Sequence, residues 1–210
     1  MSGHDHTGHP PHEASREFEI LETAMRELLI ESGVISAEDV QAQMEKDANI
    51  RPENGARIVA RFWSDPAYRE RALADGKAAA AELGIDMNVA PDLVMLENTP
   101  KLQHVTVCTL CSCSPMFVIG PPPAWYKGTA YRKRVVRDPR GVLAEWDNIL
   151  PDDVEVRVVD VTTETRYLVI PVRPAGTEGW SEEELAKLVT RDSMFGVEQA
   201  LKPGAAGKPS

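Results

Sequence analysis

The residues best suited to chemistry are three cysteines that lie close together in the chain. Cys108, Cys111 and Cys113 are the only cysteines among 210 residues. A disulfide framework uses an even number of cysteines spread along the chain, so a structural staple does not fit this pattern. Clustered thiols indicate metal binding or redox chemistry instead.

Each common thiol site makes a different demand on this cluster. A structural zinc site needs four ligands, and the only histidine outside the N-terminal tail, His104, precedes Cys108 by four residues in an expected strand. An iron–sulfur cluster typically needs a fourth cysteine. A thioredoxin-like pair would use Cys108 and Cys111 and leave Cys113 unexplained. From spacing alone, a metal site, a redox pair and buried structural cysteines all remain open.

The tripeptide Cys111-Ser112-Cys113 can also bind a metal through its backbone. Its two thiolates can chelate one ion, with the peptide nitrogens of Ser112 and Cys113 close by. If these nitrogens lose their protons, they complete a square plane of two sulfurs and two nitrogens. Cys108 would add an axial sulfur and leave a sixth position open. Amide deprotonation needs a small, highly charged ion, which indicates trivalent cobalt or iron rather than zinc.

The elements that must position this loop change in character along the chain. Residues 16–90 are rich in helix formers and carry few large apolar residues, so we expect a helical N-terminal arm. The arm would pack either on its own C-terminal domain or on another subunit. Its expected helices are 17–31, 36–47 with Ser36 as N-cap, 54–63, and 66–83 with a break near Gly76.

Residues 91–201 mix strands and helices and would form an α/β metal-binding catalytic domain. Strands are expected at 93–96, 104–107, 154–161 and 166–172, with residues 162–165 turning a hairpin between the last two. Helices are expected at 130–136 and 141–146, and from a capping box of Ser181 and Glu184. The fold class is therefore α+β. Residues 202–210 are expected to form a loose C-terminal tail.

Charge and composition limit the partners. The formal net charge of −10 argues against nucleic acid and anionic membranes as partners. We find no membrane-spanning apolar run and no secretory signal, so we expect a cytoplasmic protein. Residues 1–15 read as a disordered His-rich tail, which would be either solvated or a weak divalent-metal site through His4, His6, His9 and His12.

The segment Val-Cys-Thr-Leu-Cys-Ser-Cys at 107–113 resembles the metal-binding signature of nitrile hydratase α subunits, which thiocyanate hydrolase shares in its corresponding subunit. The resemblance extends over about residues 17–200. It includes the segments 122–127, 131–136, 138–140, 166–167, 173–177 and 179–183.

The resemblance implies a layered α-β-β-α fold, a heteromer with one or more β-type nitrile hydratase subunits, and a small-molecule nitrile hydrated to its amide. Cys108, Cys111, Ser112 and Cys113 would hold the metal, with Cys111 oxidised to sulfinate and Cys113 to sulfenate. Arginines of the β subunit would bind those oxygens. Thr109 resembles the cobalt class, so non-corrin cobalt(III) is expected ahead of iron(III). Catalysis would involve Cys111, Ser112 and Cys113.

Several questions stay open at the level of sequence. The attacking oxygen would come from metal-activated water or from the Cys113 sulfenate. The alternative functions are the thiocyanate hydrolase metal subunit, which would give carbonyl sulfide and ammonia, and a non-catalytic zinc or redox interaction module.

The segment after the motif departs from many relatives, which carry an aromatic residue and then Trp-Pro where Ser114, Met116 and Phe117 stand. This loop borders the substrate side in the family. The change indicates either an altered substrate range, including bulky or heterocyclic nitriles, or a compensated packing change. Arg166 aligns with a family arginine near the subunit interface, and is either a contact behind the metal ligands or an ordinary surface arginine.

Overall fold

A computed structural model describes residues 16–204 of the chain, which divides into two compact units, Met1–Ile50 and Arg51–Ser210. The expected His-rich tail at 1–15 lies outside the described residues, as do residues 205–210 of the expected C-terminal tail. The two units are described separately below.

The first unit contains two helices, α1 (Arg16–Glu31) and α2 (Ala37–Ala48). The predicted N-cap of α2 is confirmed, because the Ser36 hydroxyl accepts a hydrogen bond from the Asp39 backbone N–H at 3.0 Å. Neither helix has a buried residue. Instead, a groove on this unit has an apolar lining formed by Phe18, Leu21, Met25, Leu29, Ile35 and Val40.

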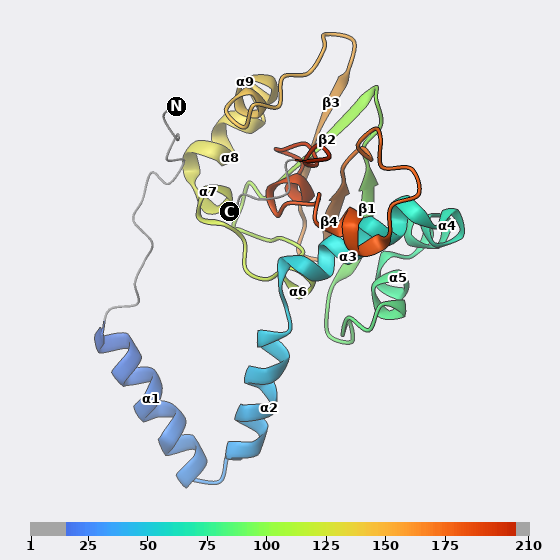
Figure 1. The fold of residues 1–210 in the computed structure, drawn as a ribbon. Coiled ribbons are helices and arrows are strands. Elements are labelled where there is room, and N and C mark those ends of the chain that lie inside the picture. Colours follow the sequence, from blue (N-terminus) through green and yellow to red (C-terminus); the bar gives the residue numbers. More distant parts are fainter. Residues whose placement is uncertain (1–15, 205–210) are drawn as a thin grey trace. The chain divides into compact units, whose positions relative to one another are not determined.

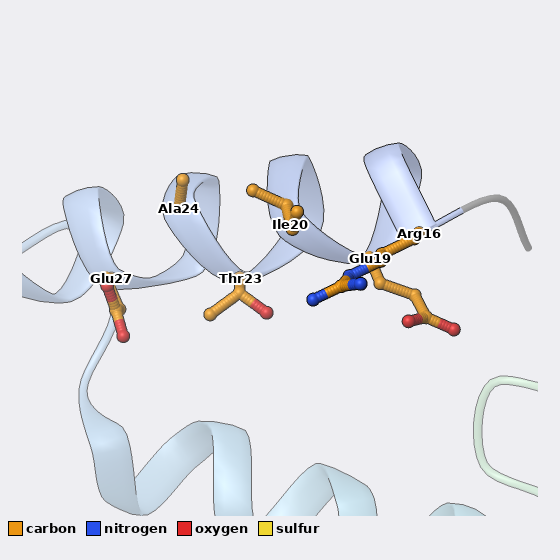
Figure 2. Close-up of a pocket in the computed structure, with 6 residues that line it drawn as sticks. All are labelled: Arg16, Glu19, Ile20, Thr23, Ala24 and Glu27. Carbon is orange, nitrogen blue, oxygen red and sulfur yellow. The ribbon is translucent and has the colours of Figure 1, made fainter.

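A second hollow lies on α1 alone and is more polar. Its lining consists of Arg16, Glu19, Ile20, Thr23, Ala24 and Glu27 (Figure 2). None of these side chains is a thiol or an imidazole, so this hollow offers no second site for a soft metal ion.

The second unit is built on two small parallel sheets. Strand β1 (Asp92–Glu97) pairs with β4 (Thr165–Ile170), and β2 (Leu102–Val107) pairs with β3 (Glu155–Asp160). The four predicted strands are present, but the predicted hairpin at 162–165 is wrong. These residues link strands that belong to different sheets, because β3 and β4 each pair with a strand from earlier in the chain.

Helices cover the outer faces of the two sheets (Figure 1). On one side, α4 (Pro66–Ala74) and α5 (Gly76–Glu82) contact β1; on the other, α9 (Pro139–Ala144) contacts β3 and α8 (Thr129–Val135). Contacts between β2 and β4 join the sheets. This is the expected order of helix, sheet, sheet and helix, and it confirms the α+β class.

Short elements complete the second unit. Helix α3 (Pro52–Ser64) packs on α10 (Glu182–Ala186), whose predicted capping box of Ser181 and Glu184 is confirmed. The predicted break near Gly76 is also present, because Asp75 caps a separate helix there. Three elements were not predicted: α6 (Met116–Ile119), α7 (Ala124–Lys127) and the 3-10 helix η1 (Asp192–Phe195).

The hydrophobic core of the second unit joins residues from both predicted regions of the chain. Ile58 and Val59 of α3 belong to the same buried cluster as Val105, Leu168 and Phe195. The change in character near residue 90 is therefore a change of secondary structure, whereas the division into compact units falls forty residues earlier, after Ile50. Among the helices of residues 16–204, none has the length and apolar character needed to cross a bilayer.

Candidate metal centre

The cysteine loop begins where strand β2 ends. Cys108 directly follows Val107, the last residue of β2, and the loop runs on to α6. The adjacent strand β3 ends at the same edge, where the Val161 N–H donates to the Val107 carbonyl at 2.7 Å. The loop thus lies at the carboxyl ends of two parallel strands, a common location for ligand sites in open parallel sheets.

The three thiols face one another. The Sγ atoms of Cys108 and Cys111 are 3.3 Å apart, and those of Cys111 and Cys113 are 3.1 Å apart. All three lie within 4.8 Å of one another, and among residues 16–204 no other group of three or more His, Cys, Asp or Glu side chains gathers in this way. Cys108 is buried, Cys113 is intermediate and Cys111 is exposed. The cluster is therefore anchored to the core at one end and open to solvent at the other.

Three side chains from outside the loop fix its backbone. The Asp160 carboxylate, at the end of β3, accepts hydrogen bonds from the Thr109 N–H at 3.0 Å and the Thr109 hydroxyl at 2.5 Å. Arg132, from α8, donates to the Cys111 carbonyl at 3.0 Å. The Tyr126 hydroxyl, from α7, donates to the Cys113 carbonyl at 2.9 Å.

Tyr126 is held by the aromatic side chains around it. It packs on the rings of Tyr131 and Phe195 and is fully buried. Tyr131 in turn donates to the Thr106 carbonyl on β2 at 2.7 Å. Burial raises the pKa of both tyrosines, so both hydroxyls are hydrogen-bond donors at neutral pH.

The thiols of the loop differ in acidity. Hydrogen bonds from Cys113 and Cys108 lower the pKa of Cys111 to about 7, because they stabilise its thiolate. Burial raises the pKa of Cys113 to about 11, with a further contribution from its hydrogen bond to Cys111, while the charge of Arg166 opposes this rise. The exposed thiol of Cys111 therefore becomes an anionic ligand more readily than the thiol of Cys113.

The other predicted residues lie around this cluster in different ways. The Ser114 hydroxyl is buried without a hydrogen-bond partner among the described residues. Met116 is exposed at the start of α6, whereas Phe117 is half-buried against the core. Arg166 donates to the carbonyls of Thr162 and Thr163, and its charge acts on Cys113.

His104 lies outside the thiol cluster. Its predicted position in a strand, four residues before Cys108, already implied this. Its ring Nδ1 lies 3.2 Å from the Asn98 side-chain oxygen. It is buried in β2, and burial lowers its pKa, with a smaller contribution from the charge of Arg157. The imidazole is therefore part of the core and offers no fourth ligand to the cysteines.

Sequence reasoning missed the three anchors of the loop. Arg132 belongs to a basic run with Lys133, Arg134 and Arg137, and the sequence alone does not distinguish this run from a solvated helix face or a subunit contact. In the structure, Arg132 donates a hydrogen bond to the Cys111 carbonyl, whereas Arg134 forms an ion pair with Glu145. Asp160 had one available signal, since polar residues at the carboxyl ends of parallel strands often serve a site. That signal can be used only when β3 is known to pair in parallel with β2, and the expected hairpin paired this strand with the next one instead.

Comparison with known proteins agrees with the motif. The family model described as nitrile hydratase, alpha chain, matches residues 16–198. The high-molecular weight cobalt-containing nitrile hydratase subunit alpha of Rhodococcus rhodochrous is 51% identical over 189 residues, which cover 89% of this chain and 93% of that protein. Thiocyanate hydrolase subunit gamma of Thiobacillus thioparus is 44% identical over 206 residues, covering 93% and 84% of the two chains.

Similarity in three dimensions extends over the same length. A double mutant of the Fe-type nitrile hydratase from Comamonas testosteroni Ni1 superposes with a TM-score of 0.80 at 40% identity, covering 93% of this chain and 96% of the other. The family model covers most of the chain, and the sequence relatives and the solved structure agree with it. The chain therefore belongs to the nitrile hydratase alpha-chain family.

Proposed function

We propose that this chain is the metal-carrying α subunit of a nitrile hydratase, which hydrates a nitrile to its amide at a non-corrin cobalt(III) centre. The observation that carries this proposal is the group of three thiols within 4.8 Å of one another. It occupies the loop at the edge of β2 in a chain whose relative at 51% identity is named a cobalt-containing nitrile hydratase subunit.

The donor set fits a small trivalent ion better than it fits zinc. Three soft sulfurs converge, and the described residues supply no histidine or carboxylate to the group that would complete a tetrahedron. We propose Cys108, Cys111 and Cys113 as sulfur ligands, and the peptide nitrogens of Ser112 and Cys113 as the remaining ligands. Cobalt is favoured over iron by the names of relatives and by Thr109, although a structural neighbour is of the Fe type.

Different residues of the chain would have different roles at the metal centre. A bound trivalent ion supplies Lewis acidity that polarises the nitrile. The buried Cys108 fixes the cluster to the core, while the exposed Cys111 leaves the cluster accessible to a substrate from solvent. Met116, exposed beyond the loop, would line the approach and limit the shape of the nitrile. Arg166 would place positive charge near Cys113 and its oxidised forms.

A β-type subunit is the proposed partner, and the proposed contact is the first unit. The apolar groove of α1 and α2 remains exposed there, with Phe18 68% and Met25 57% accessible to solvent. Helices of this size and exposure gain stability from packing on another surface. A chain with a net charge of −10 and an oxidised, anionic centre would also gain from arginines supplied by a partner.

Metal analysis tests the proposal most directly. Chain produced with cobalt and iron supplied equally should hold about one cobalt per chain, since it has a single thiol cluster. Mass spectrometry of the peptide containing residues 108–113 would report its added oxygens. Zinc without cobalt or iron would favour the interaction module instead, and an excess of iron over cobalt would contradict the Thr109 argument.

Activity separates the proposed function from its nearest alternative. A direct assay of the alternative is needed because thiocyanate hydrolase subunit gamma is 44% identical to this chain, in an alignment that covers 93% of it. We expect amide formation from nitriles to exceed thiocyanate consumption. Cys113→Ala should lose both activity and most of the metal, whereas Ser112→Ala should retain metal because its proposed ligand is a backbone nitrogen. Full activity in Cys113→Ala would refute the assignment of the site.

A further inference from the structure

The hydrogen bond from Arg132 reaches a particular peptide of the cysteine loop. The carbonyl that it binds at 3.0 Å belongs to Cys111, and the nitrogen of the same peptide group is that of Ser112. This nitrogen is one of the two backbone ligands in the proposed function, on which the present inference rests. Arg132 therefore contacts the oxygen end of a peptide whose nitrogen end would bind the metal.

The guanidinium of Arg132 is not engaged by an acid elsewhere. Within residues 16–204, no ion pair is found for it, unlike its neighbour Arg134, which pairs with Glu145. Its Nε atom is buried and has no hydrogen-bond partner among the described groups. Across the described part of the chain, the guanidinium thus donates to the loop backbone and no carboxylate lies close enough to form an ion pair with it.

A peptide that binds a metal through its nitrogen releases its proton to solvent base, and its negative charge spreads over nitrogen and oxygen. A cation that donates a hydrogen bond to this oxygen is charge-assisted and stronger than a neutral donor. We propose that Arg132 is a positioning residue that orients the Cys111–Ser112 peptide and stabilises the charge it carries as a ligand. Metal retention would then depend on the charge of Arg132 as well as on its hydrogen bond.

The loop contains its own control. Tyr126 donates to the carbonyl of Cys113 at 2.9 Å, but the nitrogen of that peptide group belongs to Ser114, which is not a proposed ligand. Arginines also hold ordinary loop carbonyls in this protein, since Arg140 donates to the carbonyls of Leu150 and Pro151. Loss of an anchor alone should therefore affect Tyr126 and Arg132 variants alike.

The experiment compares the full-length chain with Arg132→Gln, Arg132→Lys and Tyr126→Phe, all produced with cobalt. Cobalt per chain, the rate of cobalt loss to EDTA and the X-ray absorption spectrum of the bound metal are measured. Circular dichroism checks that each variant is folded. We expect Arg132→Gln to lose cobalt about 10-fold faster, the size expected for a hydrogen bond to a charged group. Arg132→Lys should fall between it and the wild type.

Tyr126→Phe should change the rate by no more than about 2-fold, as for a neutral hydrogen bond. The cobalt that remains in Arg132→Gln should show fewer nitrogen neighbours than in the wild type. Equal rates in Arg132→Gln and Tyr126→Phe, or equal rates in Arg132→Gln and Arg132→Lys, would overturn the role of the charge. If Arg132→Gln does not fold, the neutral variant Arg132→Met takes its place, and equal rates in Arg132→Met and Tyr126→Phe would overturn it equally. A wild-type chain without cobalt would overturn the proposed function itself.

Discussion

Asp160 gives the sharpest test of how the second unit holds the cysteine loop. Its carboxylate accepts two hydrogen bonds from Thr109, one from the backbone N–H at 3.0 Å and one from the hydroxyl at 2.5 Å. Asp160→Ala removes both acceptors from the residue next to Cys108. Thr109 would then have to exchange its bonds for water, and the loop would lose its connection to β3.

The size of the effect follows from the exposure of the pair. A hydrogen bond contributes about 0.5–1.5 kcal/mol net, and more when one partner is charged. Both Asp160 and Thr109 are exposed, so we take the lower part of this range for each bond. The sum of about 1–2 kcal/mol corresponds to about a 5- to 30-fold change in the equilibrium between the ordered and the disordered loop. Cobalt loss to a chelator should accelerate by up to this factor.

The assay measures cobalt release to EDTA and the free energy of unfolding in urea for wild type, Asp160→Ala, Thr109→Val and the double variant. Thr109→Val keeps the N–H and should show roughly half of the effect. The double variant should lose little more than Asp160→Ala, because the bonds are shared. Glu155→Ala, an exposed carboxylate at the other end of β3, is the control. Release as slow in Asp160→Ala as in Glu155→Ala would refute the reasoning.

Three further predictions concern the frame around the loop. Gly196 has φ +86, and an added Cβ would lie 2.0 Å from the His104 carbonyl oxygen, so Gly196→Ala should cost about 2–4 kcal/mol in urea unfolding, against about 1 kcal/mol for Gly176→Ala in open space. If both variants lost a similar amount of unfolding free energy, β2 would be able to move away from the added Cβ, and the prediction would be wrong. His104 has a lowered pKa in the folded chain, so its contribution to stability should be complete above its unfolded pKa of about 6.5 and decline as pH falls below it. The pH dependence of unfolding should therefore be flatter in His104→Gln, and an unchanged slope would contradict this. Deletion of residues 1–48 should weaken assembly with a β-type subunit in sedimentation experiments while leaving cobalt binding intact, and unweakened assembly would exclude this unit as the contact.

Local signals predicted the helices and caps well, because those signals act within a few residues. Ser36 and Ser181 each cap the helix that follows, as their side chains and positions indicate. The pairing of β3 and β4 could not be obtained in the same way. Each strand has a pattern compatible with a hairpin, and the choice of a parallel partner depends on contacts with β1 and β2 about 50 to 75 residues earlier in the chain, as their registers indicate.

The candidate site shows the same division between local and distant information. The three cysteines were identified from their spacing, since the loop brings them together by itself. Arg132 and Asp160 come from 21 and 51 residues beyond the atoms they bind. In the sequence alone, Arg132 looks like a surface charge, and the position of Asp160 at a strand end becomes informative only once the parallel pairing is known. The folded chain therefore reveals both connections. Their roles depend on the packing of α8 and on the parallel alignment of β3 with β2.

The anchor between Thr109 and Asp160 also has a consequence for folding. It closes a loop of 51 residues, and the β2–β3 pairing that creates it is equally non-local. Contacts of such separation form late, because the entropy of closing the loop must be offset before they become favourable. During synthesis, the cysteines emerge well before the strand that fixes them. The mature geometry of the loop is therefore completed only after β3 has been made and paired, and a nascent chain ending before residue 155 would present the three thiols without this restraint.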